Sequence, residues 1–167
     1  MDFTATPPAA LWFDAARRGE VPALQQAIAA GLPIDTANAR GFSALILSCY
    51  DNKLDAACFL LDHGANPNHQ DASGNTALMG VSFKGYPEIA RLLIERGADL
   101  NRQNSSGGTA LMFATMFSRH DLLQLLLDAG ADKDVQDARG FTALHLARQQ
   151  GNETAGQLLG TPLASNK

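Results

Sequence analysis

The sequence predicts an all-α repeat solenoid, in which helix-turn-helix units joined by β-hairpin loops stack side by side. Three recurrences with one 33-residue period predict it. The stretch GNTALM at 74–79 returns as GGTALM at 107–112. Glycines keep that spacing within and beyond these stretches, at Gly41, Gly74, Gly107 and Gly140. A second glycine series ends the units in HGAN, RGAD and AGAD, at Gly64, Gly97 and Gly130. A fixed period of this length indicates one supersecondary unit copied along the chain.

Each unit is expected to open with a hairpin and a short first helix. A hydroxyl residue stands two places after the hairpin glycine, where its oxygen can cap the free N–H groups of the first turn: Ser43, Thr76, Thr109 and Thr142. Alanine and leucine follow at every copy and begin the apolar helical run. The turn to the next helix falls at residues that tolerate positive φ: Asn52, Gly85, Ser118 and Gly151.

The second helices are predicted in LDAACFLLDHG, PEIARLLIERG and DLLQLLLDAG. Pro87 suits a first helical turn, and each helix stops at a glycine that favours a left-handed C-cap. Leucine pairs are expected to form the buried stripe, namely Leu60/Leu61, Leu92/Leu93 and Leu126/Leu127. One unit cannot bury its own apolar face, so stacked neighbours must supply the stability. Replacing Leu92 or Leu126 with alanine should therefore cost about 2–5 kcal/mol.

The predicted domain is a single array over residues 1–160, followed by a frayed tail at 161–167. Its five repeats cover about 5–37, 38–70, 71–103, 104–136 and 137–160. The terminal repeats should differ from the inner ones because one face of each meets water. Trp12 replaces the repeated leucine in the first unit, and Gln25 and Gln26 suit its solvated face. The last unit also differs at positions where the inner repeats carry apolar residues. It has Glu153, Thr154, Gly156 and Gln157 there. Both caps are present, which predicts a complete array.

These motifs resemble the ankyrin repeat family. The matching stretches are GFTALH at 140–145, GNTALM at 74–79 and the pattern L-[LI]-x-x-G-A-[DN] at 60–66, 93–99 and 126–132. The resemblance spans about residues 8–160. Alanine replaces the family's proline after the capping residue in four copies, and the family's histidine survives only at His145. The resemblance therefore implies that most histidine-mediated bonds between repeats are absent. The Thr-Ala-Leu-Met version is similar to small stand-alone bacterial ankyrin proteins.

Composition and charge argue against several classes of protein function. The 167 residues are 46% hydrophobic and 18% charged, which is typical of a folded chain. A net charge of −4 without a long Lys/Arg run argues against a dedicated nucleic-acid binder. The start, MDFTATPPAALWFD, does not resemble a secretory signal, and no stretch approaches the 18 apolar residues of a membrane span. Cys49 and Cys58 are too few for a disulfide framework and predict a reducing, cytoplasmic location.

No catalytic constellation is found in the sequence. A GxGxxG phosphate loop is absent, and no paired carboxylates have a reason for shifted pKa values. The histidines, His63, His69, His120 and His145, lack metal-ligand or haem-ligand spacing. The sequence therefore predicts a protein that is not an enzyme and holds no cofactor or metal.

The resemblance implies that hairpins and first helices form a concave face for protein partners. The family's contact positions, carried onto this sequence, give the candidate partner-binding residues Arg40, Phe42, Tyr50, Asp51, Asn75, Phe83, Lys84, Met116, Phe117, Arg139 and Phe141. The row Tyr50, Phe83 and Met116 predicts an exposed apolar stripe. The alternative is that these side chains pack between adjacent helices. Phe42 and Phe141 are favoured as partner contacts. Phe113, in register with Gly80, is favoured as packing.

The predicted function is a protein-binding scaffold that is monomeric alone and has no membrane or nucleic-acid partner. The resemblance further implies an accessory or inhibitory subunit of a partner enzyme, such as the proteins that accompany catalases. Two alternatives stay open. One is a small-molecule or haem carrier that uses aromatic and methionine side chains with a histidine. The other is a nucleic-acid binder using basic residues at Arg17, Arg18, Arg40, Lys84, Arg119 and Arg139.

Overall fold

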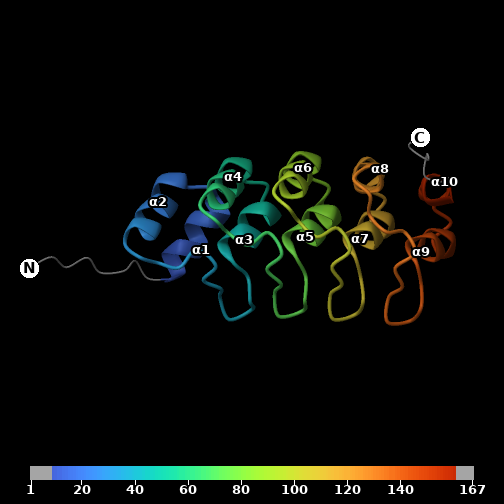
Figure 1. Cartoon of the computed structure of the whole chain (residues 1–167), viewed down its shortest axis with the longest axis horizontal. Helices are drawn as coiled ribbons and strands as arrows, with labels where there is room; N and C mark the ends of the chain where they lie inside the picture. The colour runs from blue at the N-terminus through green and yellow to red at the C-terminus, as the bar shows by residue number, and fades with distance from the viewer. Residues whose placement is uncertain (1–8, 161–167) are drawn as a thin grey trace, which may run out of the picture.

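A computed structural model describes residues 9–160 of the chain, which form five consecutive helix pairs (Figure 1). The helices are α1 (Ala9–Arg18), α2 (Val21–Ala29), α3 (Ala44–Tyr50), α4 (Leu54–Asp62), α5 (Ala77–Lys84), α6 (Pro87–Glu95), α7 (Ala110–Met116), α8 (His120–Asp128), α9 (Ala143–Gln149) and α10 (Glu153–Gly160). The predicted all-α repeat array is confirmed. The predicted tail at 161–167 and the predicted start of the first repeat at 5–8 lie outside the described residues.

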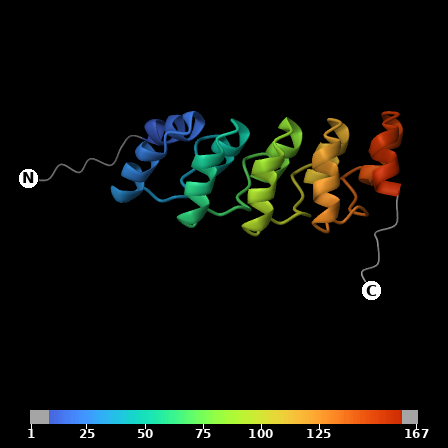
Figure 2. The same cartoon turned by 90° about the horizontal axis from the view of Figure 1, so that it is seen from above.

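The helices stand in two parallel rows (Figures 1 and 2). Odd-numbered helices contact one another in order, and even-numbered helices do the same in the second row. The long loops between repeats project from the odd-numbered row. Between residues 9 and 160 these loops contain one isolated β-bridge, Ala37 with Ser43, and no extended strand. The loops follow a hairpin path, and backbone hydrogen bonds, such as that from the Asp71 N–H to the Asn75 carbonyl, fix their shape together with side-chain hydrogen bonds.

Local sequence signals place the helix ends. The four predicted capping side chains each accept a hydrogen bond from the backbone N–H three residues later, at Ile46, Met79, Met112 and His145. Pro87 begins α6, as predicted. The turn residues inside the repeats all have positive φ, including the two that are not glycine, Asn52 at 58° and Ser118 at 53°. The cap and turn predictions are therefore confirmed.

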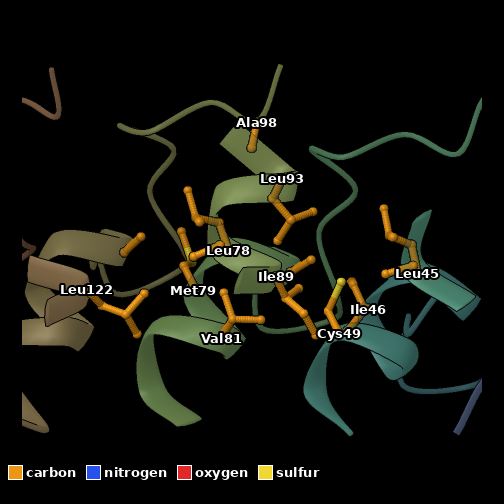
Figure 3. Close-up of a cluster of buried hydrophobic side chains, with 14 of the residues drawn as sticks. Leu45, Ile46, Cys49, Leu78, Met79, Val81, Ile89, Leu93, Ala98 and Leu122 are labelled. Atoms are coloured by element: carbon orange, nitrogen blue, oxygen red, sulfur yellow. The ribbon is translucent and has the colours of Figure 1, made fainter. Parts of the chain in front are cut away.

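The core is continuous and runs both within each repeat and between neighbouring repeats. Figure 3 shows part of it, with side chains of α3, α5 and α6 gathered in a single cluster. Leu60, Leu93 and Leu126 are fully buried at the same position of three consecutive units. Leu92 is only half-buried, so its placement in the buried stripe was wrong. Leu92 stands one residue before the buried position. Because a helix turns by about 100° per residue, Leu92 lies at the edge of the buried face of α6.

The terminal repeats differ from the inner ones as predicted. Trp12 is 1% exposed at the position of the repeated leucine, and Gln25 and Gln26 face solvent on α2. At the other end, Glu153 and Gln157 are exposed on α10. Polar side chains therefore face solvent on the outer helices α2 and α10, while Leu11 of α1 is also 59% exposed.

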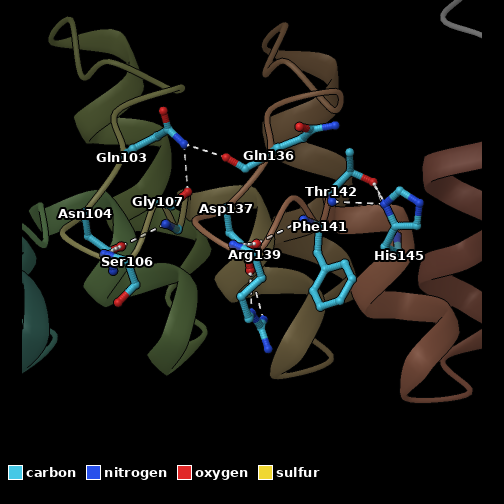
Figure 4. Close-up of polar contacts among 11 residues, drawn as sticks. Gln103, Asn104, Ser106, Gly107, Gln136, Asp137, Arg139, Phe141, Thr142 and His145 are labelled. Atoms are coloured by element: carbon cyan, nitrogen blue, oxygen red, sulfur yellow. Dashed lines mark hydrogen bonds and ion pairs between the residues drawn. The ribbon is translucent and has the colours of Figure 1, made fainter.

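Hydrogen bonds between adjacent hairpins set the spacing of the stack (Figure 4). The Ala72 N–H donates to the Arg40 carbonyl at 2.9 Å, and equivalent backbone bonds join the later loops. Gln103 Nε2 donates to the Gln136 carbonyl at 2.8 Å and to the Gly107 carbonyl of its own loop at 2.9 Å. Gln70 makes the matching pair of bonds one repeat earlier. These glutamines join hairpins of neighbouring repeats, whereas His145 bonds within its own repeat, to Thr142.

Candidate partner-binding face

The candidate site is the inner face, which we define as the hairpin loops together with the odd-numbered helices. A single hydrogen-bond pattern shapes each hairpin. One side-chain oxygen accepts the backbone N–H groups two and four residues later, from Asn38, Asp71, Asn104 or Asp137. Asn and Asp serve this role equally because both offer a carbonyl-type acceptor. The hairpin backbones therefore match, and differences between them lie in the side chains that they present.

Four aromatic rings run along the inner face across three repeats. We call Tyr50, Phe83, Phe117 and Phe113 the aromatic row. Tyr50 stacks on Phe83 with ring centroids 6.3 Å apart, and Phe83 meets the edge of Phe117 at 4.5 Å. Phe117 in turn stacks with Phe113 at 6.5 Å. The predicted stripe passed from Phe83 to Met116, whereas the ring contacts continue through Phe117.

The aromatic row combines the two roles that the sequence left open. Its rings pack on one another across repeat boundaries, yet Tyr50 remains 41% exposed and Phe117 42% exposed. Lys84 Nζ also lies 4.9 Å from the Tyr50 ring centroid, within the range of a cation–π contact. The rings thus stabilise one another and still offer apolar surface to solvent.

A groove of about 380 Å³ opens beside the aromatic row between the second and third repeats. Its walls come from two hairpins and from α1, α3, α5 and α7, and they include the candidate residues Arg40, Phe42, Tyr50, Asn75 and Phe83. Gly80 lies at its floor, where the other inner repeats carry Leu47 and Phe113. Phe113 packs against the core, as predicted, but its ring does not fill the space at Gly80. A Cβ on Gly80 would meet only Tyr50 Cδ2, at 3.3 Å, beyond its own helix.

A second hollow of about 550 Å³ lies between the fourth and fifth repeats. Met116 and Arg139 line it, and Phe113 lines both hollows. Phe113 therefore stands between the two openings. Of the candidate residues, Asp51, Lys84, Phe117 and Phe141 line neither hollow.

Arg40 and Arg139 occupy equivalent hairpin positions, but their side chains make different contacts. The Arg139 guanidinium donates to Asp137 Oδ2 at 2.9 Å and lies 4.9 Å from the Phe141 ring centroid. Burial opposes ionisation of Asp137, but hydrogen bonds from the Phe141 N–H and from Arg139 outweigh it and lower the pKa of that carboxyl. Arg40 stands beside Asn38 instead. Its side chain has no hydrogen-bond or ion-pair partner among residues 9–160.

Other candidate residues are held by neighbours in the array. Asn75 Oδ1 accepts a hydrogen bond from Asn104 Nδ2 at 2.9 Å. Phe42 and Phe141 are half-buried against the core, so they contribute to packing as well as to the surface. Asp51 lies 4.0 Å from Arg17, at the limit of an ion pair.

Most of the basic residues that could contact nucleic acid are engaged within the array. Arg18 pairs with Asp14 and Glu20, and Arg119 Nε donates to the Phe83 carbonyl at 3.1 Å. Arg17, Lys84 and Arg139 have the contacts described above. They do not form a continuous patch of unpaired cations.

The histidines stand apart from the two hollows. Within the described part of the chain, the walls of both hollows include no histidine. His63 packs on the Phe59 ring at 4.1 Å, and its Nδ1 lies 2.8 Å from the Phe59 carbonyl oxygen. No group of three or more His, Cys, Asp or Glu side chains in the described part of the chain could hold a metal ion.

The two rows of helices, the hairpins on one side and the hollowed inner face define a helical repeat scaffold. A family model described as ankyrin repeats (3 copies) matches residues 12–104 and 78–165. The chain therefore belongs to the ankyrin repeat family. Proteins built of these repeats generally bind other proteins. No helix among residues 9–160 is long and apolar enough to cross a membrane.

One similar curated protein is "Protein fem-1 homolog A-like" of Mus musculus. It is 42% identical to this chain over 45 residues, which cover 27% of this chain and 7% of the mouse protein. The match therefore spans little more than one repeat length and only a small part of that longer protein.

Proposed function

We propose that this chain is a non-catalytic scaffold that binds a partner protein through its inner face. The observation that carries the proposal is the aromatic row, in which Tyr50 and Phe117 keep more than 40% of their surface in solvent. Stacking of repeats does not require large apolar side chains at these positions, because Asp51 and Gln150 occupy the register of Phe117 in other repeats. Aromatic, methionine and arginine side chains are the types enriched at the centres of protein interfaces.

The remaining candidate residues surround this row and form the proposed contact surface. Arg40, Phe42 and Asn75 lie on the first groove, and Met116 and Arg139 lie on the second hollow. A surface with an apolar centre and a polar rim is the usual anatomy of a protein interface. A narrower form of the proposal is an accessory or inhibitory subunit that covers part of a partner enzyme. We place the monomeric protein in the cytoplasm, where its two free cysteines stay reduced.

The test is capture of partners with a variant that removes the exposed rings. Tyr50→Ala, Phe83→Ala and Phe117→Ala are combined, and proteins captured from an extract of the native host are compared with those captured by wild type. Partners should be lost with the variant. The lost ring contacts should destabilise the array by roughly 1–3 kcal/mol without unfolding it, because the buried leucines are unchanged.

A matched control removes another ring pair from the even-numbered row, with Phe59→Ala and His63→Ala. These two rings also contact each other, at 4.1 Å, but do not belong to the inner face. The control should keep every partner. Thermal melting followed by circular dichroism checks both variants. If the triple variant is unfolded, the rings serve packing alone, and if it stays folded and keeps its partners, the inner face is not the binding site.

A further inference from the structure

Gly80 leaves one position in the wall of the first groove without a side chain. This position in the first helix carries leucine in the second and fifth repeats and phenylalanine in the fourth, but Gly80 in the third. Gly80 has no positive φ, so its backbone does not require glycine. A glycine inside a helix weakens that helix relative to alanine. Gly80 should therefore lower the stability of α5. It lines an apolar hollow together with Tyr50, Phe83 and Phe113.

The groove carries positive charge, although the whole chain has a net charge of −4. Arg17 and Arg40 line it, and among residues 9–160 the only acidic side chain in its wall is Asp71. Asp71 Oδ1 already accepts two backbone N–H groups of its own hairpin. Arg17 has only the 4.0 Å contact with Asp51, and the Arg40 guanidinium has no partner among residues 9–160.

The size of the groove limits what can enter it. Its volume of about 380 Å³ lies near the lower end of the 300–1,000 Å³ typical of ligand pockets. One large side chain and the main chain beside it fit such a space, whereas a folded domain does not. An apolar hollow flanked by the unpaired guanidinium of Arg40 and by Arg17, which has only the 4.0 Å contact with Asp51, complements an apolar side chain flanked by carboxylates.

We infer that the groove between the second and third repeats binds an extended acidic peptide segment of the partner. One large apolar side chain of that segment enters the hollow above Gly80, and a neighbouring Asp or Glu pairs with Arg40. The inference rests on the proposed protein-binding function and adds the chemistry of the ligand to it. Arg40 is well suited to carboxylate recognition because its planar guanidinium can donate two parallel hydrogen bonds.

The experiment selects peptides from a display library of random 12-residue sequences on the full-length chain. Peptides recovered on wild type should combine Phe, Leu or Trp with an adjacent Asp or Glu. A synthetic copy of the best peptide is then titrated into three variants by fluorescence polarisation. Gly80→Leu, which fills the hollow, should weaken binding at least tenfold. Arg40→Gln should weaken binding about tenfold, because it removes a charge-assisted bond.

The third variant, Arg91→Gln, is the control. Arg91 is exposed on α6, outside the inner face and outside both hollows. This change should alter peptide affinity less than twofold. Added salt should weaken peptide binding to wild type more than to Arg40→Gln. Gly80→Leu should melt at or above the wild-type temperature, because leucine is the better helix former and the exposed Tyr50 ring can shift by a few tenths of an ångström.

Three outcomes would overturn the inference. The recovered peptides could lack acidic residues, their affinity could be unchanged in folded Gly80→Leu, or the library could yield no binder. None of these outcomes decides the proposed function, which the capture experiment with the triple ring variant tests separately. If capture also shows no dependence on the inner face, both proposals fail. If capture depends on it while the peptide results are negative, only the acidic-peptide inference fails.

Discussion

The hairpins at 38–42 and 137–141 have the sequences NARGF and DARGF. This single difference goes with a difference in whether the arginine pairs with its own hairpin. Asn38 and Asp137 accept the same two backbone N–H groups. Only Asp137 also carries a charge, which holds the Arg139 guanidinium at 2.9 Å. Arg40 has no such partner among the described residues and lines the first groove.

In each of these hairpins, the residue that fixes the backbone and the arginine that can contact a ligand lie within two positions of each other. The acceptor oxygen fixes the hairpin and can belong to either residue type. The charge beside it sets whether the neighbouring arginine is satisfied inside the protein or available to a ligand. The first helices differ in a similar way. Gly80 has no side chain at the register position that Phe113 occupies in the next repeat.

The largest effects should come from leucines that are buried at the repeated position of the stack. Leu60 and Leu126 are fully buried at the same position of the second and fourth repeats. Leu60→Ala and Leu126→Ala should each lower the free energy of unfolding by about 2–5 kcal/mol, measured by urea denaturation. Leu92→Ala is the control and should cost less, because that side chain is only half-buried. A much larger cost for one of the two buried leucines would show that the second and fourth repeats are not packed equivalently.

An exchange of the two acceptor residues should move the available arginine from one hairpin to the other. Asn38→Asp should pair Arg40 internally and weaken binding of the acidic peptide about five- to tenfold. Asp137→Asn should release Arg139 and leave binding at the first groove unchanged. Both variants should keep the hairpin, since each retains a side-chain acceptor. Peptide titration measures the effect, and an unchanged affinity in Asn38→Asp would show that Arg40 takes no part in binding.

The sequence predicted the repeated features of the fold well because each repeated residue has a local reason. Ser43 and Thr76 cap helices, Asn52 and Ser118 take positive φ in turns, and these roles depend on neighbours within a few residues. The period then placed every unit against the next. The half-buried state of Leu92 was missed because a pair of leucines does not reveal which member faces the neighbouring repeat.

The candidate site was predicted less completely because its features depend on contacts between repeats. The sequence placed Tyr50, Phe83 and Phe117 on one face, but it could not show that their rings touch across repeat boundaries. It also gave Arg40 and Arg139 the same role. The signal that separates them was present in the register, as Asn38 against Asp137, but its meaning required the distance from Asp137 to the guanidinium.

The smallest expected effect is a pH-dependent contribution of Asp137 to stability. Hydrogen bonds from the Phe141 N–H and from Arg139 outweigh the opposing effect of burial, so the pKa of this carboxyl lies below its ordinary value in the folded protein. An ordinary aspartate has a pKa of about 3.9. The carboxylate therefore stabilises the fold at neutral pH, and this contribution disappears as the pH falls through the lowered pKa. It should amount to less than about 1 kcal/mol, because Arg139 is largely exposed.

Asp137→Asn isolates this contribution, because asparagine keeps the acceptor that serves the same hairpin position at Asn38 and Asn104. Wild type should exceed the variant in free energy of unfolding at pH 7, and the difference should shrink in acid, as the pH falls through the lowered pKa of Asp137. Urea denaturation at pH 7 and in acid measures it, and titration of the other carboxylates cancels in the difference. A gap that stays constant with pH would mean that the acceptor geometry, rather than the charge, distinguishes the two residues. The contrast between the paired Arg139 and the available Arg40 would then lose its electrostatic basis.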